Sequence, residues 1–153
     1  MPEFEVDLLL VEDSPEDAEL TLYSLRRNNL ANRIYWAKDG EEGLDFLLCR
    51  NAFSGRSFQH PPKVILLDLK LPKVDGLEVL RQLKEDPRTK SIPVVVLTSS
   101  REESDVVRGY RNGANSYVQK PVDFEQFREA VRQLGLYWVV TNEPPPEATF
   151  SRG

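Results

Sequence analysis

The sequence predicts an α/β domain built on a doubly wound, five-stranded parallel sheet. Strand-like and helix-like segments alternate along the chain as five successive pairs, which is typical of this class. The third strand-like segment, from Lys63 to Leu71, is almost uninterruptedly apolar, as expected for a parallel strand covered on both faces. The 153 residues, 40% hydrophobic and 29% charged, suit one domain with its own core.

The first pair consists of a strand from Val6 to Val11 and a helix that begins after Ser14 and stops near Asn28-Asn29. Ser14 is an N-cap hydroxyl, Pro15 suits the first helical position, and Asp17 is the acid three residues after the cap, as in a capping box. The inward face of the helix is expected to contain Ala18, Leu22 and Leu25.

The second pair consists of a strand from Arg33 to Ala37 and a helix opened by Asp39-Gly40, with Leu44, Leu47 and Leu48 facing inward. Cys49 is expected to be a buried small apolar residue on this inward face. Residues 50–62 show no periodicity and are predicted to be the longest internal loop, with His60 solvated.

The remaining pairs follow the same pattern. A helix from Leu77 to about Lys84, burying Leu80 and Leu83, follows the third strand. The fourth strand spans Ile92 to Leu97 and is followed by a polar helix from Glu102 to Asn112, which Gly113 ends. The fifth strand is Ser116 to Gln119. The last helix starts near Asp123 and carries an apolar stripe of Phe127, Val131, Leu134 and Trp138. The folded domain is expected to span 1–142, and the Pro/Glu-rich tail 143–153 to be disordered.

The composition argues against several functions. A net charge of -5 disfavours nucleic acid or an anionic membrane as the main partner. With one cysteine and one histidine, an intramolecular disulfide, a cysteine-based zinc site and a histidine triad are not expected. Because no apolar run is long enough to cross a bilayer and the N-terminus does not resemble a signal peptide, we expect a cytoplasmic protein.

Polar residues follow four of the predicted strands: Glu12-Asp13, Asp68, Thr98 and Lys120. If the strands are parallel and adjacent, these side chains converge at one edge of the sheet, where open α/β sheets bind ligands. Three clustered carboxylates repel one another and need protons or a cation. Because only oxygen ligands are offered, the sequence favours a hard ion such as Mg²⁺.

Carboxylates, a metal, a lysine and a hydroxyl are the groups that phosphoryl transfer requires, and a carboxylate can itself become an acyl phosphate. Each residue alone also has a structural interpretation. Asp13 or Thr98 could cap a helix, Asp68 could form a turn, and Lys120 could be a surface lysine. Their joint placement at one sheet edge favours the functional interpretation.

This set of residues resembles the receiver domain of two-component response regulators, together with Leu71-Pro72, Asp75-Gly76 and Tyr117 before Lys120-Pro121. The resemblance covers residues 5–140 and implies a flavodoxin-like (βα)5 fold with strand order 2-1-3-4-5. It also implies that a sensor histidine kinase transfers a phosphoryl group to Asp68. The protein would then be a switch rather than an enzyme, with at most slow hydrolysis of its own acyl phosphate.

The same resemblance implies roles for the other site residues. Asp13, Asp68 and the backbone carbonyl of Lys70 would bind Mg²⁺, while Glu12 would act through water. Lys120 would hold the phosphoryl oxygens. The peptide bond between Lys120 and Pro121 is expected to be cis. Thr98 and Tyr117 would shift on phosphorylation and change the surface formed by the fourth helix, fifth strand and fifth helix.

Three features resemble the small regulators of bacterial and cyanobacterial phytochrome kinases. They are the long loop before Lys63, the run Gly113 to Tyr117, and Leu136-Tyr137-Trp138 followed by Asn142 to Pro145. A phytochrome-type kinase is therefore the expected partner. No DNA-binding output is expected, because nothing after Pro146 could fold.

Other functions remain as alternatives. A receiver-like module could bind partners without phosphorylation, although the full set of phosphorylation residues is present. An aspartate-nucleophile phosphatase generally needs an acid two residues after the nucleophile, where this chain has Lys70. A nucleotide or flavin binder would want a Gly-rich phosphate loop, where this chain has Glu12-Asp13-Ser14.

The end of the last helix carries apolar residues on several faces, namely Leu136, Tyr137, Val139 and Val140. A monomer rarely exposes a contiguous patch of this kind. We expect a homodimer through this helix, because twofold dimers are the commonest oligomers. Packing of the Pro-rich tail over the patch is the alternative.

Overall fold

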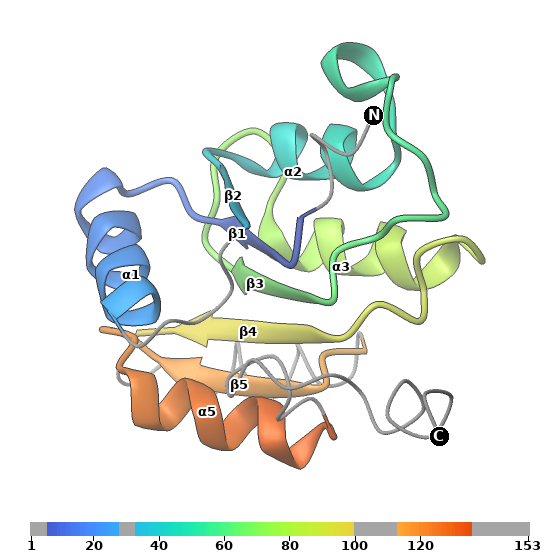
Figure 1. Cartoon of the computed structure of the whole chain (residues 1–153). Helices are drawn as coiled ribbons and strands as arrows, with labels where there is room; N and C mark the ends of the chain where they lie inside the picture. The colour runs from blue at the N-terminus through green and yellow to red at the C-terminus, as the bar shows by residue number, and fades with distance from the viewer. Residues whose placement is uncertain (1–5, 28–32, 100–112, 136–153) are drawn as a thin grey trace.

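A computed structural model describes residues 6–27, 33–99 and 113–135 of the chain. Five strands form one sheet in the order β2-β1-β3-β4-β5, and every neighbouring pair is parallel (Figure 1). The fold class and the strand order that the sequence predicts are therefore confirmed. The strands are β1 (Leu8–Val11), β2 (Ile34–Ala37), β3 (Val64–Asp68), β4 (Val94–Thr98) and β5 (Ser116–Gln119).

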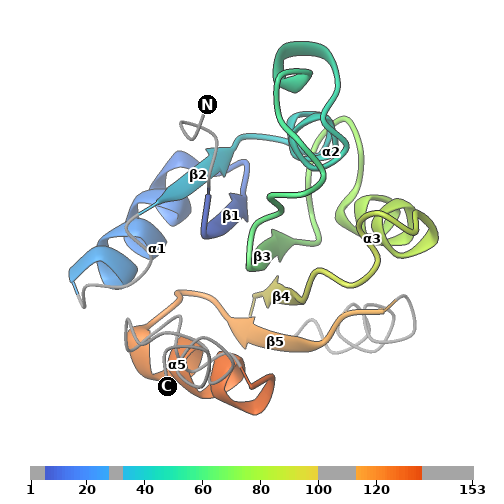
Figure 2. The same ribbon diagram turned by 45° about the vertical axis from the view of Figure 1, so that its right-hand side comes forward.

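Helices cover both faces of the sheet, as Figures 1 and 2 show from two directions. Helices α1 (Pro15–Arg27) and α5 (Phe124–Gln133) pack on one face, and α2 (Gly40–Leu47) and α3 (Gly76–Glu85) pack on the other. None of the helices in the described ranges has the length and apolar character needed to cross a bilayer.

Alternate residues of the buried strands supply the two cores. In β3, Val64 and Leu66 join the cluster under α1 and α5, whereas Ile65 and Leu67 join the cluster under α2 and α3. All five residues of β3 are buried, because side chains on both faces of a doubly wound sheet are covered by helices. The continuous apolar run in the sequence is the direct consequence, and it places Asp68 at the point where the strand emerges.

The start of α1 differs from the predicted capping box. The Ser14 hydroxyl does accept the Asp17 N–H at 3.2 Å, as expected. The Ser14 N–H, however, donates to Oε2 of Glu12 at 3.1 Å, so the returning carboxylate comes from Glu12 and not from Asp17. The Asp17 carboxylate instead contacts Lys120, across the sheet edge.

The segment 50–62 is more ordered than its lack of periodicity predicts. It contains a short 3-10 helix, η2 (Asn51–Phe53), and it buries Phe53 and Arg56. The Arg56 guanidinium lies 3.8 Å from the centre of the Phe46 ring and donates hydrogen bonds to the carbonyl oxygens of Phe46 and, at 3.2 Å, His60. His60 itself is exposed, as predicted. Segment 50–62 is therefore packed against α2.

The prediction for Cys49 is wrong. Helix α2 ends at Leu47, so Cys49 lies beyond it, with a positive φ of 54° and a partly exposed side chain. Its Sγ lies 3.6 Å from Nη1 of Arg56. Leu44 and Leu47 are buried as expected, whereas Leu48 is only partly buried because it is already at the end of the helix.

The last helix is shorter than predicted, because α5 ends at Gln133, with Leu134 as its C-cap and Gly135 at a positive φ of 77°, and does not continue toward Trp138. Other element boundaries shift by one or two residues. The first strand begins at Leu8 rather than Val6, and the fourth spans Val94 to Thr98, which brings Thr98 into the strand. The predicted helix 102–112, the apolar residues 136–140 and the tail 143–153 lie outside the described residues.

Candidate phosphoryl-acceptor site

The strand ends bring the predicted site residues together. Asp68 is the last residue of β3 and Thr98 the last residue of β4, while Glu12-Asp13 and Lys120 directly follow β1 and β5. These four strands are neighbours and run in the same direction, so their carboxyl ends share one edge of the sheet.

Three carboxylates form a cluster at this edge. Glu12, Asp13 and Asp68 each offer an oxygen, and these oxygens all lie within 4.8 Å of one another. Glu12 and Asp68 are buried, whereas Asp13 is exposed. Oxygen donors at this spacing, without a thiolate or imidazole, suit a hard divalent cation with access from solvent.

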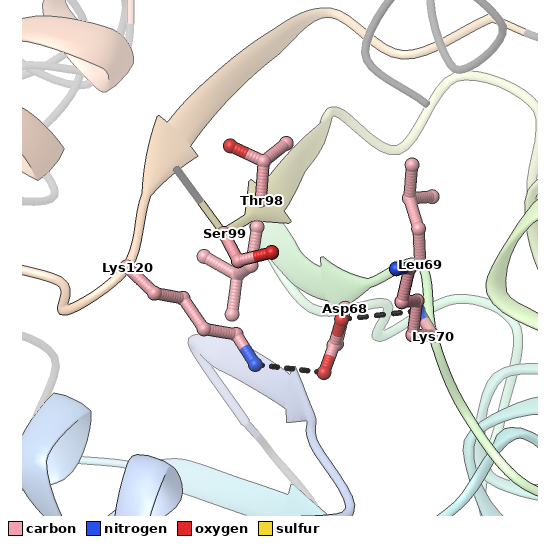
Figure 3. Close-up of a pocket in the computed structure, with 7 residues that line it drawn as sticks. Asp68, Leu69, Lys70, Thr98, Ser99 and Lys120 are labelled. Atoms are coloured by element: carbon pink, nitrogen blue, oxygen red, sulfur yellow. Dashed lines mark hydrogen bonds and ion pairs between the residues drawn. The ribbon is translucent and has the colours of Figure 1, made fainter. Parts of the chain in front are cut away.

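The Lys120 ammonium contacts two members of this cluster, Glu12 and Asp68. Its Nζ lies 2.8 Å from Oδ2 of Asp68, 2.9 Å from Oε1 of Glu12 and 3.2 Å from Oδ2 of Asp17. Figure 3 shows the lysine side chain reaching from the end of β5 toward the Asp68 carboxylate. The predicted cis Lys120-Pro121 bond is confirmed.

The contacts of Lys120 with Glu12 and Asp68 affect the pKa values in the site. Burial raises the pKa of Glu12 to about 7, the nearby Lys120 ammonium opposes the increase, and the Asp68 charge adds to it. Burial also disfavours the charged form of Lys120, but its contacts with the Asp68 and Glu12 carboxylates outweigh burial and raise the pKa of Lys120. Lys120 is therefore an ammonium at neutral pH.

An open pocket of about 80 Å³ lies beside Asp68. It is lined by Asp68, Leu69, Lys70, Leu97, Thr98, Ser99 and Lys120. Figure 3 shows that the Thr98 hydroxyl points away from the Asp68 carboxylate, while Ser99 lies between Thr98 and Lys120 in this view. The Lys70 N–H donates to Oδ1 of Asp68 at 3.1 Å, so the two Asp68 oxygens have different partners.

Tyr117 lies farther out on β5. Along this strand exposed and buried residues alternate, and Tyr117 is on the exposed side, with 50% of its surface accessible. The sequence correctly places Tyr117 on the strand that leads to Lys120, and the described structure has its side chain half exposed.

The structure adds three residues that the sequence analysis did not assign to the site. Asp17 contacts Lys120, and the indole Nε1 of Trp36 donates to the backbone carbonyl of Glu12 at 2.7 Å. Gly76 packs so closely on the end of β3 that a Cβ there would overlap the carbonyl oxygen of Asp68 and Cα of Leu69. In the sequence, Asp17 is interpreted as a capping acid and Asp75-Gly76 as part of the receiver resemblance, and neither pattern indicates these contacts.

Comparisons with known proteins agree with this geometry. The family model of the response regulator receiver domain matches residues 8–132. The chain belongs to the response regulator receiver domain family. Receiver domains bind Mg²⁺ in an acidic pocket, work with sensor histidine kinases, and generally act as phosphoryl-accepting switches rather than enzymes.

The similar proteins include regulators of phytochromes. The bacteriophytochrome response regulator RtBRR is 53% identical, with a TM-score of 0.80 over 92% of this chain and 84% of its own. The probable methanogenesis regulatory protein FilR2 of Methanothrix harundinacea is 43% identical over 92% of this receiver chain and 88% of its own length. A structure of the response regulator Rcp1 in its Mn²⁺-bound form is 36% identical, with a TM-score of 0.69 over 86% of this chain and 93% of its own.

Proposed function

We propose that this receiver is a phosphoryl-accepting switch and that Asp68 is the acceptor. The observation that carries the proposal is the position of the Asp68 carboxylate, between the Lys120 ammonium at 2.8 Å and a cluster of two further carboxylates. The Lys70 N–H holds Oδ1, and the adjoining pocket has room for a small group such as a phosphoryl group.

The chemistry follows from these contacts. A carboxylate oxygen of Asp68 attacks the phosphorus of a phosphohistidine, forming a P–O bond as the P–N bond breaks. The imidazole nitrogen keeps the electron pair and takes a proton. Lys120 neutralises charge on the transferred phosphoryl oxygens, which is the main demand of a phosphoryl-transfer transition state.

The residues present fit a magnesium ion. Asp13, Asp68 and the backbone carbonyl of Lys70 are the proposed ligands, with Glu12 acting through water. When bound, Mg²⁺ supplies further neutralisation of the phosphoryl oxygens. The exposed position of Asp13 gives the ion a route from solvent, and the Mn²⁺-bound form of the related Rcp1 supports a divalent ion.

Thr98 and Tyr117 are proposed to transmit phosphorylation of Asp68 to a change in the protein surface. The Thr98 hydroxyl is to move toward the phosphorylated Asp68, and Tyr117 is to move inward from its half-exposed position on β5. The affected surface comprises β5, α5 and residues 100–112, the last of which lie outside the described residues. Slow loss of the phosphoryl group by hydrolysis, with Lys70 beside the pocket, completes the cycle.

A phytochrome-type histidine kinase in the cytoplasm is the proposed donor, supported by the 53% identity to RtBRR. Self-association through residues 136–140 stays a prediction, because these residues lie outside the described ranges. Gel filtration of the full chain against a chain ending at Gly135 tests it, and a dimer that survives the truncation would contradict it.

The acceptor is tested by intact-mass measurement after incubation with acetyl phosphate and Mg²⁺. We expect one added phosphoryl group on the unmodified chain and none on Asp68→Asn. Labelling of Asp68→Asn at the wild-type level would mean that another residue is the acceptor. Absence of labelling in the wild type, with acetyl phosphate or a kinase as donor, would favour a phosphorylation-independent binding module.

A further inference from the structure

Lys120 has as many carboxylate neighbours as it has N–H donors. An ammonium carries three donors, and oxygens of Asp68, Glu12 and Asp17 lie 2.8, 2.9 and 3.2 Å from its Nζ. The contacts to Asp68 and Asp17 are hydrogen bonds, whereas the contact to Glu12 is an ion pair in which Oε1 accepts no hydrogen bond. A phosphoryl oxygen that binds Lys120 therefore approaches an ammonium that carboxylates already surround, and it competes with them for that charge.

The three carboxylates differ in how readily water can replace the lysine. The side chain of Glu12 is 0% exposed and that of Asp68 is 9% exposed, whereas that of Asp17 is 43% exposed. A buried carboxylate that loses its cation pays a large desolvation cost, while an exposed one is rehydrated. Asp17 also makes the longest of the three contacts. Its contact is thus the one that costs least to break.

The local structure of α1 presents Asp17 to the lysine. In a capping box the Asp17 carboxylate would turn back to the Ser14 N–H. That N–H is already bonded to Oε2 of Glu12, and Asp17 is held through its own backbone N–H by the Ser14 hydroxyl. The carboxylate cluster that could bind a metal ion consists of Glu12, Asp13 and Asp68, and Asp17 is not part of it.

We propose that Asp17 is a positioning residue that competes with the phosphoryl group for Lys120. The Asp17 carboxylate contacts the Lys120 ammonium while Asp68 is unmodified, and this contact breaks when a phosphoryl oxygen binds Lys120. The competition lowers the affinity of the site for a phosphoryl group, and the Asp17 charge repels the phosphoryl oxygens as well. This inference rests on the proposed function of Asp68 as the acceptor.

The test is calorimetric titration of the full chain with beryllium fluoride, a mimic of the phosphoryl group, at saturating Mg²⁺. Asp17→Asn removes the charge, and Asp17→Ala removes the acceptor as well. We expect both variants to bind the mimic about two- to fivefold more tightly than the wild type, the range of an exposed ion pair. Their Mg²⁺ affinities, measured without fluoride, are expected to remain near the wild-type value.

Glu16→Gln is the matched control, because Glu16 is an exposed acid in the same first turn of α1. It removes the same charge without touching Lys120, and its affinity for the mimic is expected to stay near that of the wild type. A merely structural role of Asp17 would not tighten binding of the mimic while leaving Mg²⁺ binding unchanged.

Two results would overturn the inference. Asp17 variants that behave like Glu16→Gln would show that the Lys120 contact does not compete with the phosphoryl group. Weaker binding in the Asp17 variants would show that Asp17 supports Lys120 instead of competing for it. Failure of the proposed function looks different, because then the wild type would not bind the mimic, or Asp68→Asn would bind it equally well.

Discussion

The indole Nε1 of Trp36 donates a hydrogen bond to the backbone carbonyl of Glu12 at 2.7 Å. This bond links the end of β2 to the residue that begins the acidic cluster. A change in the backbone at Glu12 and Asp13 therefore alters the environment of the indole.

Trp36 fluorescence is therefore expected to report on metal binding. Trp36 and Trp138 are the two tryptophans, so Trp138→Phe isolates the signal of Trp36. Titration of Trp138→Phe with Mg²⁺ should change the emission in a saturable way, and Trp36→Phe should lose this response. An equal response in Trp36→Phe would show that the Trp36–Glu12 bond does not sense the metal.

Lys120→Met tests the balance of charge in the site. Methionine keeps most of the side-chain length but leaves the buried Glu12 and Asp68 without their cation. We expect the free energy of unfolding to fall by roughly 2–4 kcal/mol without metal, since the loss of one partner leaves a buried charge unpaired. Mg²⁺ binding should persist and restore part of the loss, as measured by urea unfolding with and without Mg²⁺.

The same variant should no longer respond to phosphorylation, because Lys120 contacts Asp68 directly. Amide hydrogen exchange on β5 and α5, with and without beryllium fluoride, measures the response. Wild-type stability without Mg²⁺, or a wild-type exchange response in Lys120→Met, would contradict the role assigned to Lys120.

Gly76→Ala tests the close packing of α3 on the end of β3. The added Cβ would overlap backbone atoms of Asp68 and Leu69, which cannot move aside as a flexible side chain could. We expect destabilisation of roughly 1–3 kcal/mol, typical of overpacking, and slower labelling by acetyl phosphate. Gly55→Ala is the control, because a Cβ at Gly55 has nothing within 4 Å. Equal effects of the two substitutions would contradict the proposed importance of the Gly76 contact.

The Tyr35–Glu42 pair predicts a pH dependence at high pH. Burial raises the pKa of Tyr35 to about 12, and the hydrogen bond to Glu42, at 2.6 Å, contributes to the increase. Since the unfolded pKa is 10.0, the unfolded chain loses the Tyr35 proton first as pH rises. The stability due to Tyr35 is therefore complete below pH 10 and is lost as pH rises through about 12.

Unfolding free energies of the wild type and Tyr35→Phe, compared across this range, measure the effect. The difference in unfolding free energy between the wild type and Tyr35→Phe should decrease above pH 10, the pKa of Tyr35 in the unfolded chain. A difference that stays constant up to pH 12 would show that Tyr35 ionises as readily in the folded protein as in the unfolded chain.

The sequence predicts the sheet and its edge well, because both depend on local patterns. The apolar run of β3 follows from burial on both faces, and parallel strands bring the residues at their carboxyl ends, Asp68 and Lys120 among them, to one edge of the sheet. The strand order came from the family resemblance rather than from these patterns.

What the sequence could not predict depends on contacts between distant segments. Asp17 looks like a capping residue until the structure shows that Glu12 takes the Ser14 N–H. Arg56 looks like a loop residue, yet it is buried because Phe46 offers both an aromatic face and a carbonyl oxygen. Neither contact leaves a periodic signal in the sequence, since each depends on how the folded segments pack against one another.

The identity of the acceptor is tested most directly by reducing the phosphorylated protein with borohydride. Reduction converts an aspartyl phosphate to homoserine, and peptide mass spectrometry then locates it. We expect homoserine at position 68 and unchanged aspartate at positions 13 and 17. Homoserine at position 13 or 17 with aspartate intact at position 68 would contradict this expectation.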